Sequence, residues 1–388
     1  MFIEEADRLK ELPPYLFAEI DRIINEKKSR GEDVISLGIG DPDISTPSEI
    51  IDELYREAKN QVNHRYPSSY GLMLFKEAVA EYYERRFNVK IEPSNEVIPL
   101  WGSKEGIANI AYAFINPGDI ALIPDPGYLV YKIGTLFAGG SIYPLPLLEK
   151  NNFLIDLNNI NKKVAKKAKL MHLNYPNNPT TADGNINFFK EVADFAEKNN
   201  ILVCHDNAYS EVYFDENKKP LSFLNAENSK EVGIEFNSLS KTFNMTGWRI
   251  GYAVGNKKII ESLGKYKTNV DSGIFNAIQS AGALALKNYQ KFVKQNISIY
   301  KRRREFVYKT LDKIGINYYK SNSTIYVWVK VPKSYNSTSF AELLLNKANV
   351  VVTPGNAFGN YGEGYIRISI TLLDSRLEEA LERIKKVL

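Results

Sequence analysis

The segment Ser238–Arg249 places a lysine among groups that bind phosphate. Lys241 follows an alternating apolar run at 232–236, which predicts a strand that ends just before the lysine. The hydroxyls of Ser238 and Ser240 flank it, and Arg249 comes eight positions later. A lysine beside a phosphate site is what a pyridoxal-phosphate enzyme needs, because the amine forms a Schiff base with the aldehyde while the phosphate anchors the ring. The alternative for any single lysine is a solvated loop position.

A second anion site is predicted at Gly102–Lys104, directly after a strand expected over 96–100. The free N–H groups and the dipole of the helix that begins here attract a phosphate, and Ser103 adds a hydroxyl donor. Many helices begin in this way, so an ordinary serine N-cap is the alternative.

Two loops that follow strands offer groups for a flat cofactor ring. In Asp125–Tyr128 the turn residues Pro126 and Gly127 present Tyr128, whose ring can stack on an aromatic cofactor. Asn178 lies in a proline-rich loop after the strand 170–174, and its amide can donate to a ring oxygen. The alternatives are a tyrosine packed under a loop and an asparagine that only forms a turn.

Asp206 and Tyr209 follow the strand expected at 201–205. A carboxylate at this point can pair with a protonated pyridine nitrogen, which makes the ring an electron sink. Tyr209 can donate to the 3-oxygen of the ring and so help to set the pKa of the Schiff-base lysine. For Asp206 alone, a helix cap is the alternative.

Arg367 lies within an alternating apolar strand, 364–370. A buried arginine needs a partner. A substrate α-carboxylate is one such partner, and a structural aspartate or glutamate is the alternative.

Short apolar strands alternate with helical stretches from about 95 to 255, and most of these candidates follow strands. We expect strands at 96–100, 119–123, 170–174, 201–205, 232–238 and 250–254, and helices at 104–115, 187–199 and 256–268. The alternation predicts an α/β fold with a mainly parallel sheet that is covered by helices on both faces. Ligands of such a sheet bind outside the carboxyl ends of its strands.

The pattern changes after about residue 285. A long charged helix is expected over 287–314, followed by strands near 324–331, 350–353 and 364–370 and helices at 338–347 and 375–388. We therefore predict a large domain over 46–285 and a smaller α+β domain over 286–388. The N-terminal segment 1–45, with a helix at 15–30 and a short strand at 34–38, is expected to join the small domain.

Composition excludes several classes of protein. The 388 residues are 44% hydrophobic and 25% charged, and the net charge of +4 is spread along the chain, so nucleic acid is not an expected partner. The basic run Lys301–Arg304 is expected to be a solvated helix face. No run approaches the ~18 apolar residues of a membrane span. The N-terminus lacks the features of a signal peptide. We therefore expect a cytoplasmic protein without a membrane partner.

Redox and metal chemistry are not expected. The single cysteine, Cys204, excludes an intrachain disulfide and lies in an apolar run that predicts a buried structural thiol. His205 and Asp206 are possible metal ligands, but no second histidine or cysteine lies at ligand spacing.

Taken in chain order, these groups resemble the fold-type-I pyridoxal-phosphate aminotransferases of class I and II. The order is a phosphate loop, a stacking aromatic residue, an asparagine, an aspartate with a tyrosine, the lysine, an arginine and a remote arginine. The resemblance covers essentially the whole chain. It implies a large domain with a mainly parallel seven-stranded sheet flanked by helices, and a smaller α+β domain.

Within that branch the chain is similar to the LL-diaminopimelate aminotransferases. The segments that carry this likeness are Leu12–Arg22, Leu37–Asp43, Arg65–Gly71, Gly102–Gly106, Val232–Phe236 and Val352–Phe358. The resemblance implies transfer of an amino group from LL-diaminopimelate to 2-oxoglutarate in lysine biosynthesis. An aspartate or aromatic aminotransferase is the alternative, and a C–S lyase of the same fold is a further one. Transcription regulators also use this fold, but here the pattern begins within the first ~15 residues and leaves no room for a preceding DNA-binding module.

The resemblance also implies a role for each matching residue. Lys241 is the Schiff-base lysine, and Asp206 and Tyr209 act with it in catalysis. The cofactor-binding residues are Tyr66, Ser103, Lys104, Tyr128, Asn178, Asp206, Tyr209, Ser238, Ser240, Lys241, Arg249 and Asn276. The substrate-binding residues are Tyr15, Gly40, Lys104, Tyr128, Asn178, Asn276 and Arg367. Tyr66 and Asn276 match positions that act from a partner subunit, which implies a homodimer with shared active sites. One departure from the family is Thr181–Asp183, where Pro-Thr-Gly-Ala is usual; we expect it to alter a loop and not the chemistry.

Overall fold

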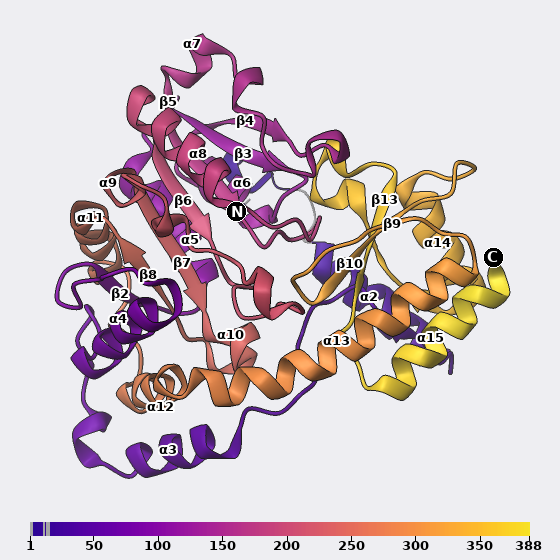
Figure 1. The fold of residues 1–388 in the computed structure, drawn as a ribbon, viewed down its shortest axis with the longest axis horizontal. Coiled ribbons are helices and arrows are strands. Elements are labelled where there is room, and N and C mark those ends of the chain that lie inside the picture. The colour runs from indigo at the N-terminus through magenta and orange to yellow at the C-terminus, as the bar shows by residue number, and fades with distance from the viewer. Residues whose placement is uncertain (1–2, 11, 13–15) are drawn as a thin grey trace.

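The computed structural model describes residues 3–10, 12 and 16–388, and it is built around a seven-stranded sheet (Figure 1). The strands lie in the order β2-β8-β7-β6-β5-β3-β4. Their bounds are Val97–Leu100 for β2, Ile120–Asp125 for β3, Ser141–Pro146 for β4, Ala168–Asn174 for β5, Leu202–Asp206 for β6, Gly233–Ser238 for β7 and Gly251–Gly255 for β8. Strand β8 runs antiparallel to the other six strands of this sheet, which are parallel to one another. The predicted mainly parallel α/β sheet is confirmed.

The strand β4 is absent from the pattern predicted from the sequence. It contains Pro144 and Pro146, and each proline lacks the N–H that a central strand donates to its neighbour. Because β4 is the last strand of the sheet, it pairs on one side only, where proline is tolerated.

Helices cover both faces of this sheet. Their bounds are Ser48–Ala58 for α3, Met73–Phe87 for α4, Ser103–Phe114 for α5, Leu129–Phe137 for α6, Lys162–Ala165 for α7, Ile186–Asn199 for α8, Ser229–Val232 for α9, Leu239–Thr242 for α10, Lys257–Thr268 for α11 and Asn276–Lys287 for α12. The apolar residues of α5, α6 and α11 share one buried cluster, and those of α4, α8 and α12 share another. Neighbouring strand residues such as Leu122 and Ile123 belong to opposite clusters, as the alternation of side chains across a strand requires.

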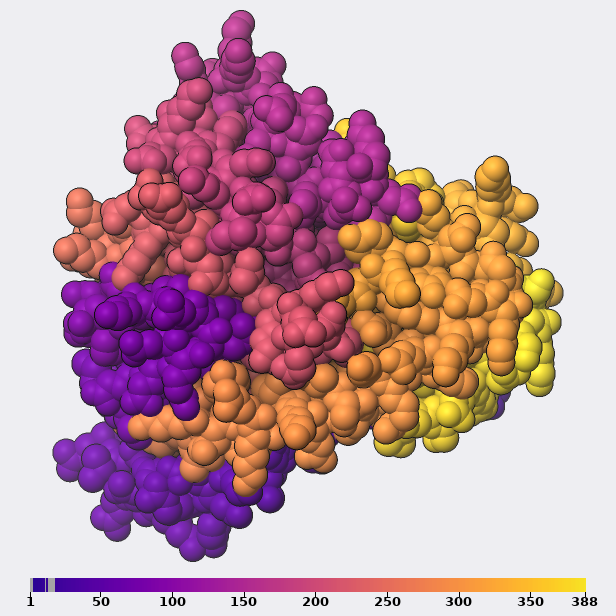
Figure 2. All heavy atoms as spheres, viewed as in Figure 1, coloured from indigo at the N-terminus to yellow at the C-terminus, as the bar shows by residue number. Residues whose placement is uncertain are grey.

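The C-terminal residues form a second layer beside the large sheet. The long helix α13, Tyr289–Lys313, runs from α12 toward this layer (Figure 1). The layer contains β9 (Tyr318–Tyr319), β10 (Tyr326–Lys330), α14 (Ser337–Ala348), β11 (Val350–Val351), β12 (Thr353–Pro354), β13 (Tyr365–Ser369) and α15 (Asp374–Val387). Its four-stranded sheet has the order β12-β13-β10-β9. In the space-filling view these orange and yellow residues pack against the middle of the chain (Figure 2).

The N-terminal elements pack with the C-terminal ones. After the short helix α1 (Asp7–Lys10), helix α2 spans Leu16–Ser29, and β1, Ile35–Ser36, pairs in parallel with β11. Ile35 and Leu37 belong to the buried cluster that fills the C-terminal layer. This pairing is compatible with an N-terminal segment that joins the small domain, while the domain bounds 1–45, 46–285 and 286–388 stay a prediction.

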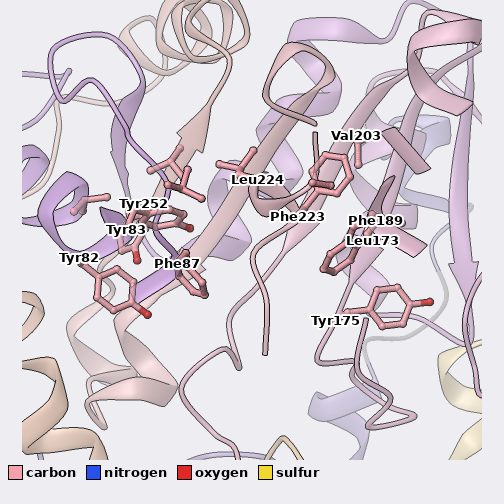
Figure 3. Close-up of a cluster of buried hydrophobic side chains, with 14 of the residues drawn as sticks. Tyr82, Tyr83, Phe87, Leu173, Tyr175, Phe189, Val203, Phe223, Leu224 and Tyr252 are labelled. Carbon is pink, nitrogen blue, oxygen red and sulfur yellow. The ribbon is translucent and has the colours of Figure 1, made fainter. Parts of the chain in front are cut away.

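The largest buried cluster is rich in aromatic side chains (Figure 3). Tyr82, Tyr83 and Phe87 of α4 lie together near Tyr252 of β8, with edge-to-face contacts such as 6.1 Å between the ring centroids of Tyr83 and Tyr252. Rings in this arrangement stabilise the fold beyond the area that they bury. The cluster holds α4 and α8 on the sheet, and therefore fixes the frame from which the strand ends project.

A buried carboxylate, Glu235 of β7, joins several elements behind the sheet. It accepts hydrogen bonds from the Tyr83 hydroxyl at 2.6 Å and the Asn207 amide at 3.0 Å, and its Oε2 lies 2.7 Å from His205 Nδ1. Burial alone raises the pKa of Glu235, but the hydrogen bonds from these groups hold that pKa below its ordinary value. The other ring nitrogen of His205 contacts the Tyr175 carbonyl oxygen at 3.0 Å. Both ring nitrogens of His205 are therefore in contact with buried groups of the protein.

The basic run on α13 agrees with the expected solvated face at Lys301 and Arg302, which are exposed, but not at Arg303 and Arg304. Arg303 is only 5% exposed, and its guanidinium pairs with Asp43 at 2.7 Å and with Asp374 at 2.7 Å. The Arg304 guanidinium lies 4.0 Å from the centre of the Phe214 ring. The run therefore holds α13 against its neighbours. In the part of the chain that the structure describes, no helix is long and apolar enough to cross a membrane.

Candidate active site

The register of the large sheet brings the ends of its strands to one edge. Gly251 at the start of β8 lies opposite both Leu100 at the end of β2 and Ser238 at the end of β7. Asp206 at the end of β6 lies opposite Asn174 at the end of β5. Most of the site residues predicted from the sequence lie at these strand ends or directly after them. They are therefore found at a single edge of the sheet.

The candidate phosphate loop lies where two strand ends meet. A methyl group added to Gly102 would lie 2.3 Å from Arg249 Nη2, and one added to Gly251 would lie 2.8 Å from the Ser103 backbone nitrogen. Gly102 also has φ of +75°, a conformation that favours glycine. These glycines let Arg249 and the first N–H groups of α5 come close together. Beside them, Ser238 Oγ accepts from the Ser240 N–H at 3.2 Å.

Lys241 lies on the short helix α10, directly after β7, and is partly buried. Its amine donates to the Gly40 carbonyl oxygen at 2.6 Å. Burial lowers the pKa of this amine. A lysine with a lowered pKa is more often the free base, which is the form that attacks an aldehyde or takes a proton.

Asp206 is a buried carboxylate with one unused oxygen. The Tyr131 hydroxyl donates to its Oδ2 at 2.8 Å, while its Oδ1 has no hydrogen-bond partner in the part of the chain that the structure describes. Burial raises the pKa of Asp206 to about 6, against the effect of the Tyr131 hydrogen bond. At neutral pH the carboxylate is therefore mainly ionised and lacks a partner for Oδ1, which is costly unless a ligand supplies one.

Tyr131 is a site residue that the sequence reasoning missed. It lies one helical turn after Tyr128, and the two rings meet edge to face with centroids 5.8 Å apart. Its other side stacks on His172, at 4.9 Å between centroids. The three-residue spacing from Tyr128 predicts that the two rings are neighbours, because residues three apart lie on one face of a helix.

Arg367 is buried without an acidic partner among the described residues. Its two terminal nitrogens donate to Asn178 Oδ1 and to the Gly38 carbonyl oxygen, each at 2.6 Å, and its Nε has no partner. Its guanidinium lies 4.1 Å from the centre of the Tyr326 ring and 4.7 Å from that of Phe358. In the described part of the chain, Arg367 is therefore not paired with a structural aspartate or glutamate. A buried cation without an anion is costly, which makes Arg367 a candidate for binding one.

Tyr326 of β10 is a second residue that the sequence reasoning missed. Its hydroxyl lies 3.1 Å from the Tyr209 hydroxyl, and a methyl group added to Gly40 would lie 2.1 Å from it. Burial raises the pKa of Tyr209 above its ordinary range, and Tyr326 acts in the same direction. Through these contacts Tyr326 links Tyr209, Gly40 and Arg367. Strand alternation predicted β10 but not which of its residues face the site.

The structure places the remaining candidates as follows. Asn178 connects the two halves of the site, because its backbone N–H donates to Asn174 Oδ1 at 2.7 Å while its own Oδ1 accepts from Arg367. Lys104 follows Ser103 in the first turn of α5. Tyr66 is 91% exposed on this chain, and Asn276 begins α12. Tyr15 lies outside the described residues.

The departure at Thr181–Asp183 shapes a buried loop. Thr181 has a positive φ of 65°, and its backbone N–H donates to the Asn177 carbonyl oxygen at 2.9 Å. Asp183 Oδ1 is buried and has no hydrogen-bond partner among the residues with a described structure, and Ser323 of the C-terminal layer lies beside the carboxyl group. Burial raises the pKa of Asp183 to about 6.

Asp183→Asn is expected to stabilise the cofactor-free protein at pH 7.5 but not at pH 4. The folded chain keeps the Asp183 proton up to about pH 6, whereas the unfolded chain loses it near its ordinary value of 3.8. The folded state thus binds more protons between these values, so the free energy of unfolding falls as pH rises through this window. A shift of this size corresponds to an effect on the order of 3 kcal/mol.

Thermal unfolding of parent and variant at pH 4, 6 and 7.5 measures the effect. The midpoint difference should grow with pH, while the exposed control Asp194→Asn should show no such growth. A constant difference between Asp183→Asn and the parent would mean that Asp183 does not titrate in this window.

Comparison with known proteins agrees with this geometry. The model of the family "Aminotransferase class I and II" matches residues 32–384. The LL-diaminopimelate aminotransferase of Moorella thermoacetica is 52% identical over 100% of this chain and 99% of its own length. That of Aquifex aeolicus is 53% identical over 99% of each. The solved structure of substrate-bound BacF from Bacillus subtilis aligns with a TM-score of 0.95 at 40% identity, over 100% of this chain and 98% of that one. On these grounds the chain belongs to the class I and II aminotransferases.

Proposed function

We propose that this aminotransferase works with pyridoxal 5′-phosphate and moves an amino group from LL-diaminopimelate to 2-oxoglutarate, giving tetrahydrodipicolinate and glutamate. This reaction belongs to lysine biosynthesis. The observation that carries the chemistry is the buried Oδ1 of Asp206, which has no hydrogen-bond partner among the described residues. Hydrogen bonds through Asn174 and Asn178 connect Asp206 to Arg367. The choice of substrate rests on the two relatives of 52% and 53% identity that are named for it.

The residues present fit pyridoxal phosphate. Asp206 offers a free carboxylate oxygen to a protonated ring nitrogen, and Lys241 offers an amine to the aldehyde. The glycines at 102 and 251 let Arg249 and the first N–H groups of α5 come together, and these groups would hold the phosphate. When bound, this group withdraws electrons from the substrate Cα and so lets its proton leave.

The phosphate and ring would be held by residues that come from several strand ends. The phosphate ligands are Ser103, Lys104, Ser238, Ser240 and Arg249. Tyr128 would stack on the ring, and Tyr209 would donate to the 3-oxygen. Since Asn178 Oδ1 already accepts from Arg367, its NH₂ group is the part that is directed to a ligand.

Lys241 is the base of the reaction. Its Nζ takes the proton from the substrate Cα and returns it later, and its lowered pKa keeps part of the amine neutral for this step. The Gly40 carbonyl oxygen, which accepts from this amine at 2.6 Å, would hold it in place between steps.

Arg367 binds the α-carboxylate that both substrates carry. The hydrogen bonds to Asn178 and Gly38 hold its guanidinium in one orientation, so its remaining N–H groups are preorganised. An amino donor and a 2-oxo acid share this carboxylate, and one arginine therefore serves both halves of the transamination.

A donor screen tests the substrate. The holoenzyme is assayed with 2-oxoglutarate and one of LL-diaminopimelate, aspartate, phenylalanine or cystathionine, and glutamate, pyruvate and ammonia are measured. We expect glutamate from LL-diaminopimelate and little from the other donors. Preference for aspartate or phenylalanine would replace the proposed substrate, and pyruvate and ammonia from cystathionine would indicate the C–S lyase alternative.

We further propose a homodimer in which Tyr66 reaches the phosphate of the partner subunit. Apolar and aromatic side chains on α3, near Tyr66 in the sequence and before α12 are exposed on this chain, namely Tyr55 at 63%, Val62 at 71% and Val270 at 61%. Surfaces of this kind mark protein contacts. The segment 66–70 also packs on the loop before α12, because a methyl group on Gly273 would lie 2.7 Å from the Ser68 carbonyl oxygen. Tyr66 and Asn276 therefore flank one region of the surface.

A cytoplasmic location stays a prediction.

A further inference from the structure

The segment 358–362 is tied to the turn that follows β3. The Asp125 carboxylate accepts from the backbone N–H of Tyr361 at 2.9 Å and of Asn360 at 3.2 Å. The Gly127 N–H donates to the Phe358 carbonyl oxygen at 3.0 Å. Three hydrogen bonds thus join the C-terminal layer to a strand end of the large sheet, and two of them depend on one charged side chain.

Gly359 makes this approach possible. It has φ of +143°, and a methyl group added to it would lie 2.1 Å from Asp125 Oδ1. Backbone and carboxylate are therefore in close contact, at a position where only glycine fits without displacing one of them.

The joined elements carry site residues at both ends. Phe358, at the start of the segment, is buried against the Arg367 guanidinium. Tyr128 follows Asp125 in the same turn and contacts Tyr131. The contact at Asp125 therefore sets the position of Phe358, which lies against Arg367, relative to Tyr128, which is expected to stack on the cofactor ring.

We propose that Asp125 is a positioning residue for the substrate carboxylate, which latches residues 358–362 to the turn after β3 and so keeps Phe358 against Arg367. The proposal rests on the proposed function, because it assumes that Arg367 binds the carboxylates of an aminotransferase. Asp125 acts through the segment and contacts no reacting atom. Its loss affects substrate binding and leaves the proton transfer at Lys241 intact.

The test compares Asp125→Ala and Asp125→Asn with the parent holoenzyme. An asparagine accepts one N–H but turns its own NH₂ toward the other, and an alanine accepts neither. We expect KM to rise about tenfold for both the amino donor and the 2-oxo acid, the scale of a hydrogen bond to a charged group, with kcat within about threefold. The absorption of the bound cofactor stays unchanged. The control is Asp156→Asn, whose carboxylate accepts from the Asn158 N–H at 3.1 Å in a local turn.

Hydrogen exchange of the cofactor-free chain measures whether Asp125 holds residues 358–362, independently of the activity. The amides of Asn360 and Tyr361 should lose protection about tenfold in Asp125→Ala and retain it in Asp156→Asn. Unchanged protection would overturn the latch, and lost protection with unchanged KM would overturn its role in binding. An inactive parent would refute the proposed function, while the exchange result would still decide whether Asp125 holds the segment.

A second variant reaches the same contact from the other side. Gly359→Ala displaces the segment while Asp125 is intact, so it should raise KM in the same way. In the Asp125→Ala background its effect should be smaller, because the carboxylate that its methyl group meets is gone. Full additivity of the two changes would show that they act independently, contrary to the proposal.

Discussion

Lys241→Ala is expected to abolish transamination, together with the visible absorption band that arises from the link between the cofactor and the lysine. The amine serves both as the attachment point and as the base at the substrate Cα. Loss of the base alone costs roughly 10⁴-fold at the upper end of what a positioned base contributes. Single-turnover transamination and the absorption spectrum of the reconstituted variant measure the two losses separately.

Lys76 supplies a matched control. It is also a buried lysine whose amine donates to a carbonyl oxygen, that of Ser94 at 2.8 Å, and burial lowers its pKa too. Lys76→Ala should keep the band and the reaction even where it lowers stability. A small added amine should restore part of the proton transfer in Lys241→Ala. Survival of the band in Lys241→Ala would show that another group holds the aldehyde.

The same variant tests the shared site. If Tyr66 serves the partner subunit, a hybrid dimer of Lys241→Ala and Tyr66→Ala chains contains one site with both defects and one site with neither. A refolded mixture should then exceed the summed activity of the two variants and bind part of its cofactor tightly. Activity equal to the sum would place Tyr66 and Lys241 of the same chain in one site.

The strand-end candidates were predictable because the local pattern sets their position. Asp206 and Ser238 follow apolar runs whose length and alternation predict strands, and parallel strands end at one edge of a sheet. No contact had to be known to place these residues together. The sheet register shows contacts that the sequence pattern does not predict. For example, Gly251 lies opposite both Leu100 and Ser238.

The partners of Arg367 were not predictable in this way. They are Asn178 and the Gly38 carbonyl, which are 189 and 329 positions away in the chain. Nothing in an apolar strand pattern distinguishes these neutral partners from a structural carboxylate, since the choice depends on how the two layers pack. Tyr326 is a similar case, because its contact with Tyr209 crosses between the layers and its contact with Gly40 joins distant parts of the chain.

The burial of Arg303 is predictable from the helical spacing of the residues around it. Tyr300, Arg303, Val307 and Leu311 are all buried on α13, at spacings of three and four that define one stripe of a helix. A basic run looks solvated when counted along the chain. Its helical position places one of its members on the buried stripe, where Asp43 and Asp374 neutralise it.

Asp206→Asn is expected to lower kcat on the order of 10²–10³-fold, the usual cost of removing one preorganised electrostatic group. The change keeps the size of the side chain and an oxygen that can accept from the Tyr131 hydroxyl. It removes the negative charge that a protonated ring nitrogen needs, so the ring is a weaker electron sink. KM for both substrates should change little, because Arg367 binds their carboxylates. Steady-state kinetics with each substrate varied in turn separates the two parameters.

Tyr131→Phe distinguishes charge from position. It removes the 2.8 Å hydrogen bond to Asp206 Oδ2 but leaves the carboxylate in place. We expect a loss of about tenfold or less, as for one hydrogen bond to a charged group. If Tyr131→Phe loses as much as Asp206→Asn, the orientation of the carboxylate is what the reaction requires and not its charge. If Asp206→Asn keeps nearly full kcat, the ring nitrogen works without a counter-charge and the central role given to Asp206 is wrong.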